Sequence, residues 1–207
     1  MKRLLMLFLC IGLIFCMSAC IEPDVSVEKP VIYLYPTEEM NVNVELDYNG
    51  TLTTTYPEYN DGWNVLASPD GTLIDPVTER EYYCLFWEGT SDVEYDFSKG
   101  FVVKREDTRA FLEDSLAKLG LTQKEANEFI IYWLPRLEQN EYNLIAFQDE
   151  VYKENAELII TPAADTTIRV FMAWKGLEEP IEIEPQVLEA PERVGFVAVE
   201  WGGTEIK

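Results

Sequence analysis

The alternation of apolar and polar positions predicts a chain built mainly from β-strands. In residues 41–48, Val and Leu alternate with Asn, Glu and Asp, which is the pattern of a strand with one buried face. The dipeptide Asn49-Gly50 follows and favours a tight turn, so we expect residues 51–56 to return as a hairpin partner. Further strands are predicted over residues 63–68, 72–75, 81–87, 100–104, 142–147, 156–161, 166–174, 181–185 and 195–201.

The apolar period changes from two to 3.6 over residues 106–138, which predicts an α-helical hairpin. Gly120 is placed to end the first helix in a left-handed conformation. Thr122 and Glu125 have the spacing of a capping box at the start of the second helix. Pro135 removes a backbone donor, so we expect the second helix to end or kink there. These elements predict a mainly β, α+β fold: an antiparallel β-sandwich or open barrel with one inserted helical hairpin.

Residues 1–19 have the pattern of a targeting segment. Lys2 and Arg3 precede the apolar run 4–17, which is 14 residues long and shorter than the ~20 that a membrane-spanning helix requires. The run ends at Met17-Ser18-Ala19-Cys20, which resembles a bacterial lipoprotein signal, in which the cysteine receives a diacylglycerol and becomes the N-terminus. The alternative is an ordinary secretory signal cut nearby.

The first interpretation places a lipid on Cys20 and the protein on the outer face of the cell membrane, or the periplasmic side of a membrane. Residues 20–29 are then a tether and residues 30–207 a single β-rich domain. Cys84 would be the one remaining thiol, so no internal disulfide is expected. Its apolar neighbours favour a buried strand residue over a nucleophile.

Charge and composition exclude several functions. The chain has 16 Lys and Arg against 38 Asp and Glu, a net charge of −22, which becomes −24 when the signal is removed. Nucleic acids and anionic surfaces would be repelled, whereas neutral glycans, peptides and basic proteins would be tolerated. There is no histidine, so Ser-His-Asp catalysis and histidine zinc sites are excluded. No phosphate-binding or dinucleotide motif occurs, and we expect no cofactor and no metal.

The remaining candidates for chemistry are carboxylates beside aromatic residues. Glu88, Glu128 and Glu200 lie in apolar surroundings, which raise a carboxyl pKa and suit general acid catalysis. Tryptophan rings offer flat faces for sugars, and an amide within a helix or turn is a candidate ligand-binding group. The candidates of these two kinds are Trp63, Trp87, Trp201, Asn127 and Asn143.

Several longer motifs carry a resemblance to other proteins. They include KPVIYLYP at 29–36, FWEG at 86–89, EANEFIIYWLP at 125–135 and VEWGGTEI at 199–206. The string resembles an uncharacterised family of exported proteins of bacteria and archaea, over nearly all of residues 29–206. The resemblance implies a single folded unit and brings no catalytic residues.

The sequence therefore favours a membrane-anchored extracytoplasmic lipoprotein that binds an extracellular glycan or peptide, or has a structural role, and is not an enzyme. The alternative is a carboxylate-dependent hydrolase of cell-envelope or environmental polysaccharide, which requires the candidate glutamates to line one cleft. A third hypothesis is an assembly partner whose acidic face docks to a basic protein.

Overall fold

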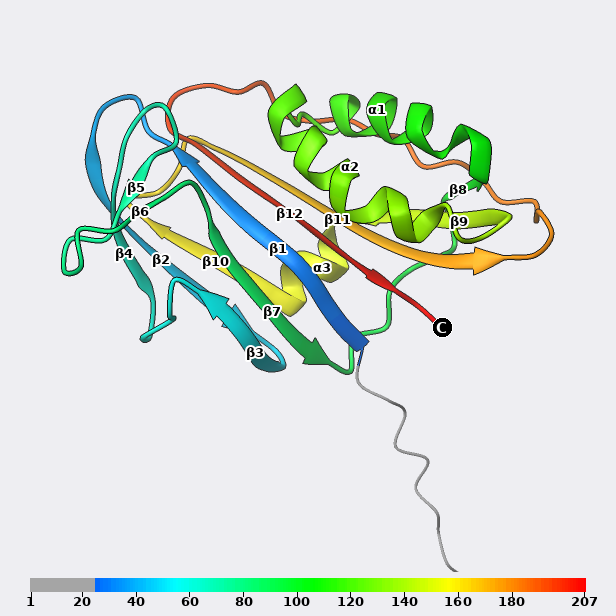
Figure 1. The fold of residues 1–207 in the computed structure, drawn as a ribbon, viewed down its shortest axis with the longest axis horizontal. Helices are drawn as coiled ribbons and strands as arrows, with labels where there is room; N and C mark the ends of the chain where they lie inside the picture. The colour runs from blue at the N-terminus through cyan, green and yellow to red at the C-terminus, as the bar shows by residue number, and fades with distance from the viewer. Residues whose placement is uncertain (1–24) are drawn as a thin grey trace, which may run out of the picture.

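Two β-sheets packed face to face form most of the protein (Figure 1). The computed structural model describes residues 25–207. The larger sheet has the strand order β3 (Thr51–Tyr56), β7 (Leu85–Ser91), β1 (Val25–Tyr35), β12 (Val197–Glu205), β11 (Thr166–Leu177), β9 (Tyr142–Gln148) and β8 (Phe101–Lys104). The smaller sheet has the order β10 (Ala156–Thr161), β2 (Met40–Tyr48), β4 (Trp63–Ala67), β5 (Leu73–Ile74) and β6 (Glu81–Tyr82). All neighbours are antiparallel except β11 and β12.

The larger sheet is buried on both faces because its strands are apolar on both sides. On β1, Val31, Tyr33 and Tyr35 belong to one hydrophobic cluster, whereas Ile32 and Leu34 belong to a second. The first cluster lies between the sheet and two helices, and the second lies between the two sheets. We call these the helix face and the sandwich face of the larger sheet. The predicted β-rich fold with an inserted helical pair is confirmed.

The two helices are α1 (Thr108–Lys118) and α2 (Gln123–Leu137), and they cover part of the helix face (Figure 1). Gly120 has φ +86°, and the amides of Gly120 and Leu121 donate to the carbonyls of Ala117 and Leu116, so α1 ends in a Schellman motif. The capping box of Thr122 and Glu125 begins α2 as predicted.

The prediction that α2 ends at Pro135 is wrong. The helix continues through Pro135 to Leu137, whose side chain is fully buried. Pro135 lies in the last turn, so only one helical hydrogen bond is lost, and burial of Leu137 outweighs that loss.

The predicted hairpin at Asn49-Gly50 is also wrong. The strands on either side of the turn belong to different sheets: β2 pairs with β10 and β4, whereas β3 pairs with β7. The turn is therefore a corner at which the chain crosses between the sheets. The predicted strands over residues 63–68 and 72–75 are present as β4 and β5, which pair with each other through Leu66–Ile74 and Ala67–Leu73.

A long connection, residues 178–196, returns the chain from β11 to its parallel neighbour β12, and we call it the strap. Its last residues bind Asp165 and Thr166, and three further contacts hold it along its length. The Gly100 amide donates to the Glu184 carbonyl at 2.9 Å, the Gln186 side chain pairs with the Phe147 backbone at 2.8 Å, and Arg193 binds Glu125 at 2.9 and 3.0 Å. The predicted strand 181–185 is reduced to a single bridge between Lys99 and Glu184, because the strap crosses the sheet edge without running along it.

Two other differences concern the ends of elements. The signal 1–19 and the lipidation site Cys20 lie outside the described residues, but residues 25–29 of the predicted tether are the first part of β1. A short helix, α3 (Glu150–Asn155), was not predicted. Between residues 25 and 207, no helix has the length and apolar content to cross a membrane.

Candidate functional site

The three candidate glutamates lie on two different faces of the larger sheet. Along β12, Glu200 alternates with residues of the helix face and therefore points into the sandwich. Along β7, Glu88 is two residues after Phe86, so both side chains point to the same face. Phe86 packs on the helix face. Glu128 lies on α2 above that same face. The three carboxylates therefore do not line one cleft, and the hypothesis that joins all three is excluded.

Glu200 is a structural group. Its side chain is fully buried and accepts hydrogen bonds from Trp87 Nε1 at 3.0 Å and from Arg169 Nε at 2.7 Å. Burial alone would lower the pKa of Arg169, but the charge of Glu200 outweighs it and holds that pKa above its ordinary value. The pair is closed off from solvent, with side-chain exposures of 5% and 0%. Substrate therefore has no access to Glu200.

The three candidate tryptophans are core residues, which corrects their prediction as sugar platforms. Trp63, Trp87 and Trp201 are at most 2% exposed, so none presents a ring face to solvent. Trp63 Nε1 donates to the Pro57 carbonyl at 2.9 Å, and Trp201 packs edge-on against Phe129. Burial of such large rings is favourable by itself and requires no ligand to explain it.

The two candidate asparagines have separate positions. Asn143 is fully buried on β9, where it donates to the Leu137 carbonyl at 2.9 Å and accepts from Asn140 at 2.9 Å. It therefore joins the end of α2 to the sheet and is not a ligand-binding group. Asn127 is exposed on α2, beside the shallow groove between α1 and α2.

The bulge of β1 is the first unusual feature of the helix face. The pairing of β1 shifts register between Glu28 and Val31 on one side and between Val27 and Val31 on the other. At the bulge, Lys29 has φ +63°, and its amide donates to Glu88 Oε1 at 3.2 Å. Positive φ is costly for a side chain other than glycine, and both bulges and strained backbones concentrate at functional sites.

Glycines in β12 make room for the bulge. A Cβ added at Gly202 would lie 3.0 Å from Pro30 Cγ, and one added at Gly203 would lie 2.8 Å from Trp133 Cζ2. The absence of side chains at these two positions allows Pro30 and Trp133 to approach the strand closely. Segments that are far apart in the sequence, 29–36, 86–89, 125–135 and 199–206, therefore meet at this place.

A groove of about 520 Å³ opens beside the bulge, and we call it the aromatic groove. It is lined chiefly by Lys29, Tyr56, Tyr82, Tyr83, Cys84 and Phe86. Tyr56 and Tyr83 are 53% and 56% exposed, in contrast to the buried tryptophans. The Lys29 ammonium lies 5.2 Å from the centre of the Phe86 ring and 5.7 Å from that of Tyr132 on α2. The groove therefore combines exposed aromatic surface with one positively charged donor.

One carboxylate, Glu81, lines the aromatic groove, and others bind groups next to it. Glu128 accepts a hydrogen bond from the Tyr33 hydroxyl at 2.7 Å, and Glu28 accepts one from the Tyr132 hydroxyl at 3.2 Å. Burial and then the contact with Glu128 raise the pKa of Tyr33 far above its ordinary value, so Tyr33 stays a neutral donor. Glu88 likewise accepts from the Lys29 amide, so the carboxylate that lines the groove and can accept from a ligand hydroxyl or amide is Glu81.

Cys84 is not the buried strand residue that we expected. The predicted strand 81–87 is divided into β6 and β7, and Cys84 lies half-buried in the bend between them. Burial raises the pKa of its thiol to about 11, with a further increase from the charge of Glu128 that Lys29 partly offsets. The thiol is therefore protonated near neutral pH and is a poor nucleophile, as expected.

Sequence reasoning found Glu88 and Glu128 but missed the tyrosines, Phe86 and Lys29. The available signal was the pair Lys29-Pro30 within an otherwise apolar strand, which marks an interruption of the ladder. Within residues 25–207, no group of three or more Cys, Asp and Glu side chains is arranged to hold a metal ion.

Comparison with known proteins gives a partial relationship. No protein-family model and no solved structure matches the chain. A protein of Butyrivibrio fibrisolvens, described as an uncharacterised protein in the bglA 3′ region, is 48% identical over 64 residues. These residues are 30% of this chain and 65% of that protein, so the chain spans just under two thirds of the relative's length. The chain is thus similar, over part of its length, to an uncharacterised bacterial protein.

Proposed function

We propose that the protein is a lipid-anchored extracytoplasmic binding module, and that the aromatic groove binds a neutral saccharide. The anchor is inferred from residues 1–20, and membership of the exported family of bacteria and archaea is inferred from the motifs at 29–36, 86–89, 125–135 and 199–206. The observation that carries the binding site is the aromatic groove, with its two exposed tyrosines beside the β1 bulge.

The chemistry of the groove suits sugars better than the other ligands considered. Tyrosine and phenylalanine faces pack against the C–H surface of a pyranose ring, and Glu81 and Lys29 in the lining can bind its hydroxyls. The net charge of −22 opposes anionic polymers. A cation is opposed at the centre of the groove, because the Lys29 ammonium already lies over Phe86 and Tyr132.

Titration calorimetry of the purified full-length chain in neutral detergent tests the binding site. The panel contains uncharged oligosaccharides of cellulose, xylan and chitin, with a polyanionic oligosaccharide as the negative control. Substitution Tyr83→Ala removes an aromatic contact worth about 1–1.5 kcal/mol, so we expect binding to weaken roughly tenfold. Val77→Ala is the matched control, because Val77 is 87% exposed and lies outside the groove. The proposal fails if no neutral saccharide binds, or if Tyr83→Ala and Tyr56→Ala leave the affinity unchanged.

The anchor is tested separately. Cells that express the chain are labelled with an alkyne analogue of palmitate, and Cys20→Ala should abolish both labelling and recovery in the membrane fraction. Label that persists in Cys20→Ala would overturn this part of the proposal without affecting the binding site.

A carboxylate-dependent hydrolase remains the second proposal, now restricted to Glu88 and Glu128. The observation in its favour is that both carboxylates act on residues that line the groove: Glu88 accepts from the Lys29 amide, and the charge of Glu128 raises the pKa of Cys84. Hydrolysis requires one carboxyl as acid and a second as base or nucleophile, about 5–9.5 Å away. Release of reducing ends from a bound saccharide, abolished in both Glu88→Gln and Glu128→Gln, would establish it. Binding without turnover would exclude it.

A further inference from the structure

The outer edge of β8 has backbone groups that no part of the described chain covers. β8 is the last strand of the larger sheet, and its other side pairs with β9, where Phe101 is opposite Ile145 and Val103 opposite Asn143. The Arg105 amide continues this ladder by donating to the Glu141 carbonyl at 3.0 Å. Because alternate residues of an antiparallel pair direct their backbone groups to opposite sides, Gly100, Val102 and Lys104 point outward.

Two of these outward positions have a partner. The Gly100 amide donates to the Glu184 carbonyl of the strap, and the Lys104 carbonyl accepts from the Thr108 hydroxyl at 3.2 Å. Within residues 25–207, the Val102 amide and carbonyl and the Lys104 amide have no partner on that side. An edge of this kind is a template for pairing with another extended chain.

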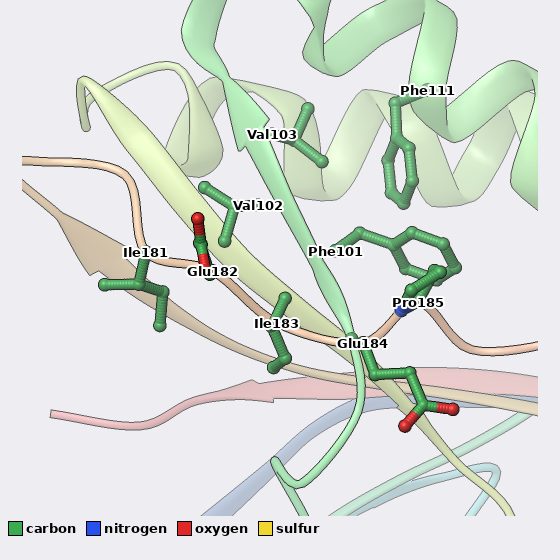
Figure 2. Close-up of a pocket in the computed structure, with 10 residues that line it drawn as sticks. Phe101, Val102, Val103, Phe111, Ile181, Glu182, Ile183, Glu184 and Pro185 are labelled. Atoms are coloured by element: carbon green, nitrogen blue, oxygen red, sulfur yellow. The ribbon is translucent and has the colours of Figure 1, made fainter.

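The strap leaves a wide opening beside this edge. A groove of about 800 Å³, which we call the edge groove, lies between β8, α1 and residues 181–185 (Figure 2). Figure 2 shows Val102 on the same side of β8 as Ile181, Glu182 and Ile183, with Phe101 and Phe111 on the other side. Ile181 is 49% exposed, and the strap is joined to this edge through Glu184, which binds the Gly100 amide and the Lys99 side chain. Apolar side chains and unpaired backbone groups are therefore available in one place.

The strap is rich in glutamate, and this negative charge favours a basic ligand in the edge groove. Residues 181–184 read Ile-Glu-Ile-Glu, and Glu182 is exposed and has no ion-pair partner in the described chain. The strap also contains Glu178, Glu179, Glu189 and Glu192. A strand in which basic and apolar residues alternate would direct its apolar side chains to the side of Phe101 and Phe111, and its cations to the side of Ile181 and Glu182.

We propose that the edge groove binds an extended segment of a partner protein with alternating apolar and basic residues, which adds to β8 as an eighth strand. Hydrogen bonds to the Val102 amide and carbonyl and to the Lys104 amide fix its register. This site is independent of the aromatic groove, because the two lie at opposite edges of the larger sheet, next to β8 and to β3.

The probe is an acetylated, fluorescein-labelled peptide of seven residues, Lys-Val-Lys-Ile-Lys-Val-Lys. Its binding to the full-length chain in neutral detergent is followed by fluorescence anisotropy. One control peptide replaces each Lys by Glu, and a second has the same composition with the four lysines grouped at one end. We expect the alternating basic peptide to bind at least tenfold more tightly than either control, because only this peptide satisfies both charge and alternation.

Two substitutions locate the bound peptide. Val102→Pro removes the outward amide without removing a bond to β9, since proline is tolerated where its nitrogen faces outward from an edge. Ile181→Lys places a like charge in the groove and leaves the backbone unchanged. Each should weaken binding at least fivefold. Val187→Lys should have no effect, because Val187, an exposed valine of the strap, lies outside the edge groove. Melting curves establish that each variant is folded, and Ile181→Lys decides the outcome if Val102→Pro does not fold.

Hydrogen exchange of the wild-type chain provides the direct observation. Bound peptide should slow exchange of the Val102 and Lys104 amides and leave the region around Tyr83 unchanged. The proposal is overturned if the alternating basic peptide fails to bind at about 1 mM, or if the grouped-lysine peptide binds equally well. Protection elsewhere, with unchanged affinity in Ile181→Lys, would overturn it as well.

Discussion

The two faces of the larger sheet differ in what covers them. The sandwich face is covered by the smaller sheet at β7, β1, β12 and β11, and its central polar groups, Arg169 and Glu200, are paired with each other. The helix face is covered by α1 and α2 over part of its area only, and the uncovered part at β1, β7 and β3 contains the aromatic groove (Figure 1). Glu200 on one face is therefore part of the core, whereas Glu88 on the other is only half-buried. The comparison suggests looking for a binding site on the part of the helix face that α1 and α2 leave uncovered.

The largest effect is expected from the sandwich face. Glu200→Ala leaves the Arg169 guanidinium buried without its partner, so the free energy of unfolding should fall by about 3–5 kcal/mol. Glu88→Ala, on the helix face of the same sheet, should cost less than about 1 kcal/mol. Urea unfolding of both variants measures the contrast. Replacement of both buried partners, Arg169→Met with Glu200→Leu, should recover most of the loss, and failure to do so would show that the pair is not the cause.

A second prediction concerns the covered part of the helix face. In Gly203→Ala the added Cβ would lie 2.6 Å from the Met172 carbonyl oxygen and 2.8 Å from the Trp133 ring. Both neighbours are in the core, so the free energy of unfolding should fall by about 1–3 kcal/mol. Thermal unfolding followed by circular dichroism measures it. An unchanged melting temperature would mean that α2 is held loosely over β12, contrary to the packing described.

The third prediction uses pH to test the ion pair between Glu125 at the start of α2 and Arg193 of the strap. Burial raises the pKa of Glu125, but hydrogen bonds from Arg193 and from the Thr122 amide outweigh it and hold that pKa below its ordinary value of 4.5. Because the pKa is lower in the folded state, the ionised carboxyl contributes stability above about pH 4.5. That contribution is lost as the pH falls through the lowered pKa.

Urea unfolding between pH 6 and pH 3 tests this dependence. Glu125→Gln should be less stable than the wild type at pH 6, by about 1–2 kcal/mol, because a charged partner of Arg193 is lost. Its stability should approach that of the wild type at pH 3. Parallel curves for the two proteins would show that other carboxylates determine the acid sensitivity.

The smallest expected effect on stability lies at the aromatic groove. Lys29→Gly relieves the positive φ of Lys29, so the free energy of unfolding should rise, by at most about 1 kcal/mol, or stay unchanged. The same substitution removes the ammonium, and saccharide binding should weaken. Calorimetry of binding together with urea unfolding separates the two effects. A loss of stability would show that the contacts of Lys29 with Phe86 and Tyr132 matter more than its backbone strain.

Local sequence patterns predicted where the helices and most of the strands lie. They did not predict which strand pairs with which. The capping box at Thr122 and the glycine at 120 are decided within a few residues, so the helical pair could be located. The strand after Asn49-Gly50 was identified, but its partner was not. Which strand it pairs with depends on the burial of β7 in the other sheet and not on the turn.

The candidate site was predicted only in part, because its composition also depends on contacts between segments that are far apart in the sequence. Glu88 and Glu128 were recognised from their apolar neighbours, but the same criterion also selected Glu200 and three core tryptophans. Residue type does not distinguish an aromatic ring in the core from one at the surface. The structure made that distinction, because the bulge at Lys29 and the end of α2 decide which rings reach solvent.

The position of β1 in the chain limits how far the groove can be from a membrane. Val25 begins β1 as the fifth residue after Cys20, and Lys29 is the ninth. At about 3.5 Å per residue, a fully extended chain between a lipid on Cys20 and Lys29 would measure roughly 30 Å. In a lipid-anchored protein, Lys29 and the groove beside it would therefore stay close to the bilayer surface. Any ligand of the groove would be met at the membrane surface and not at a distance from it.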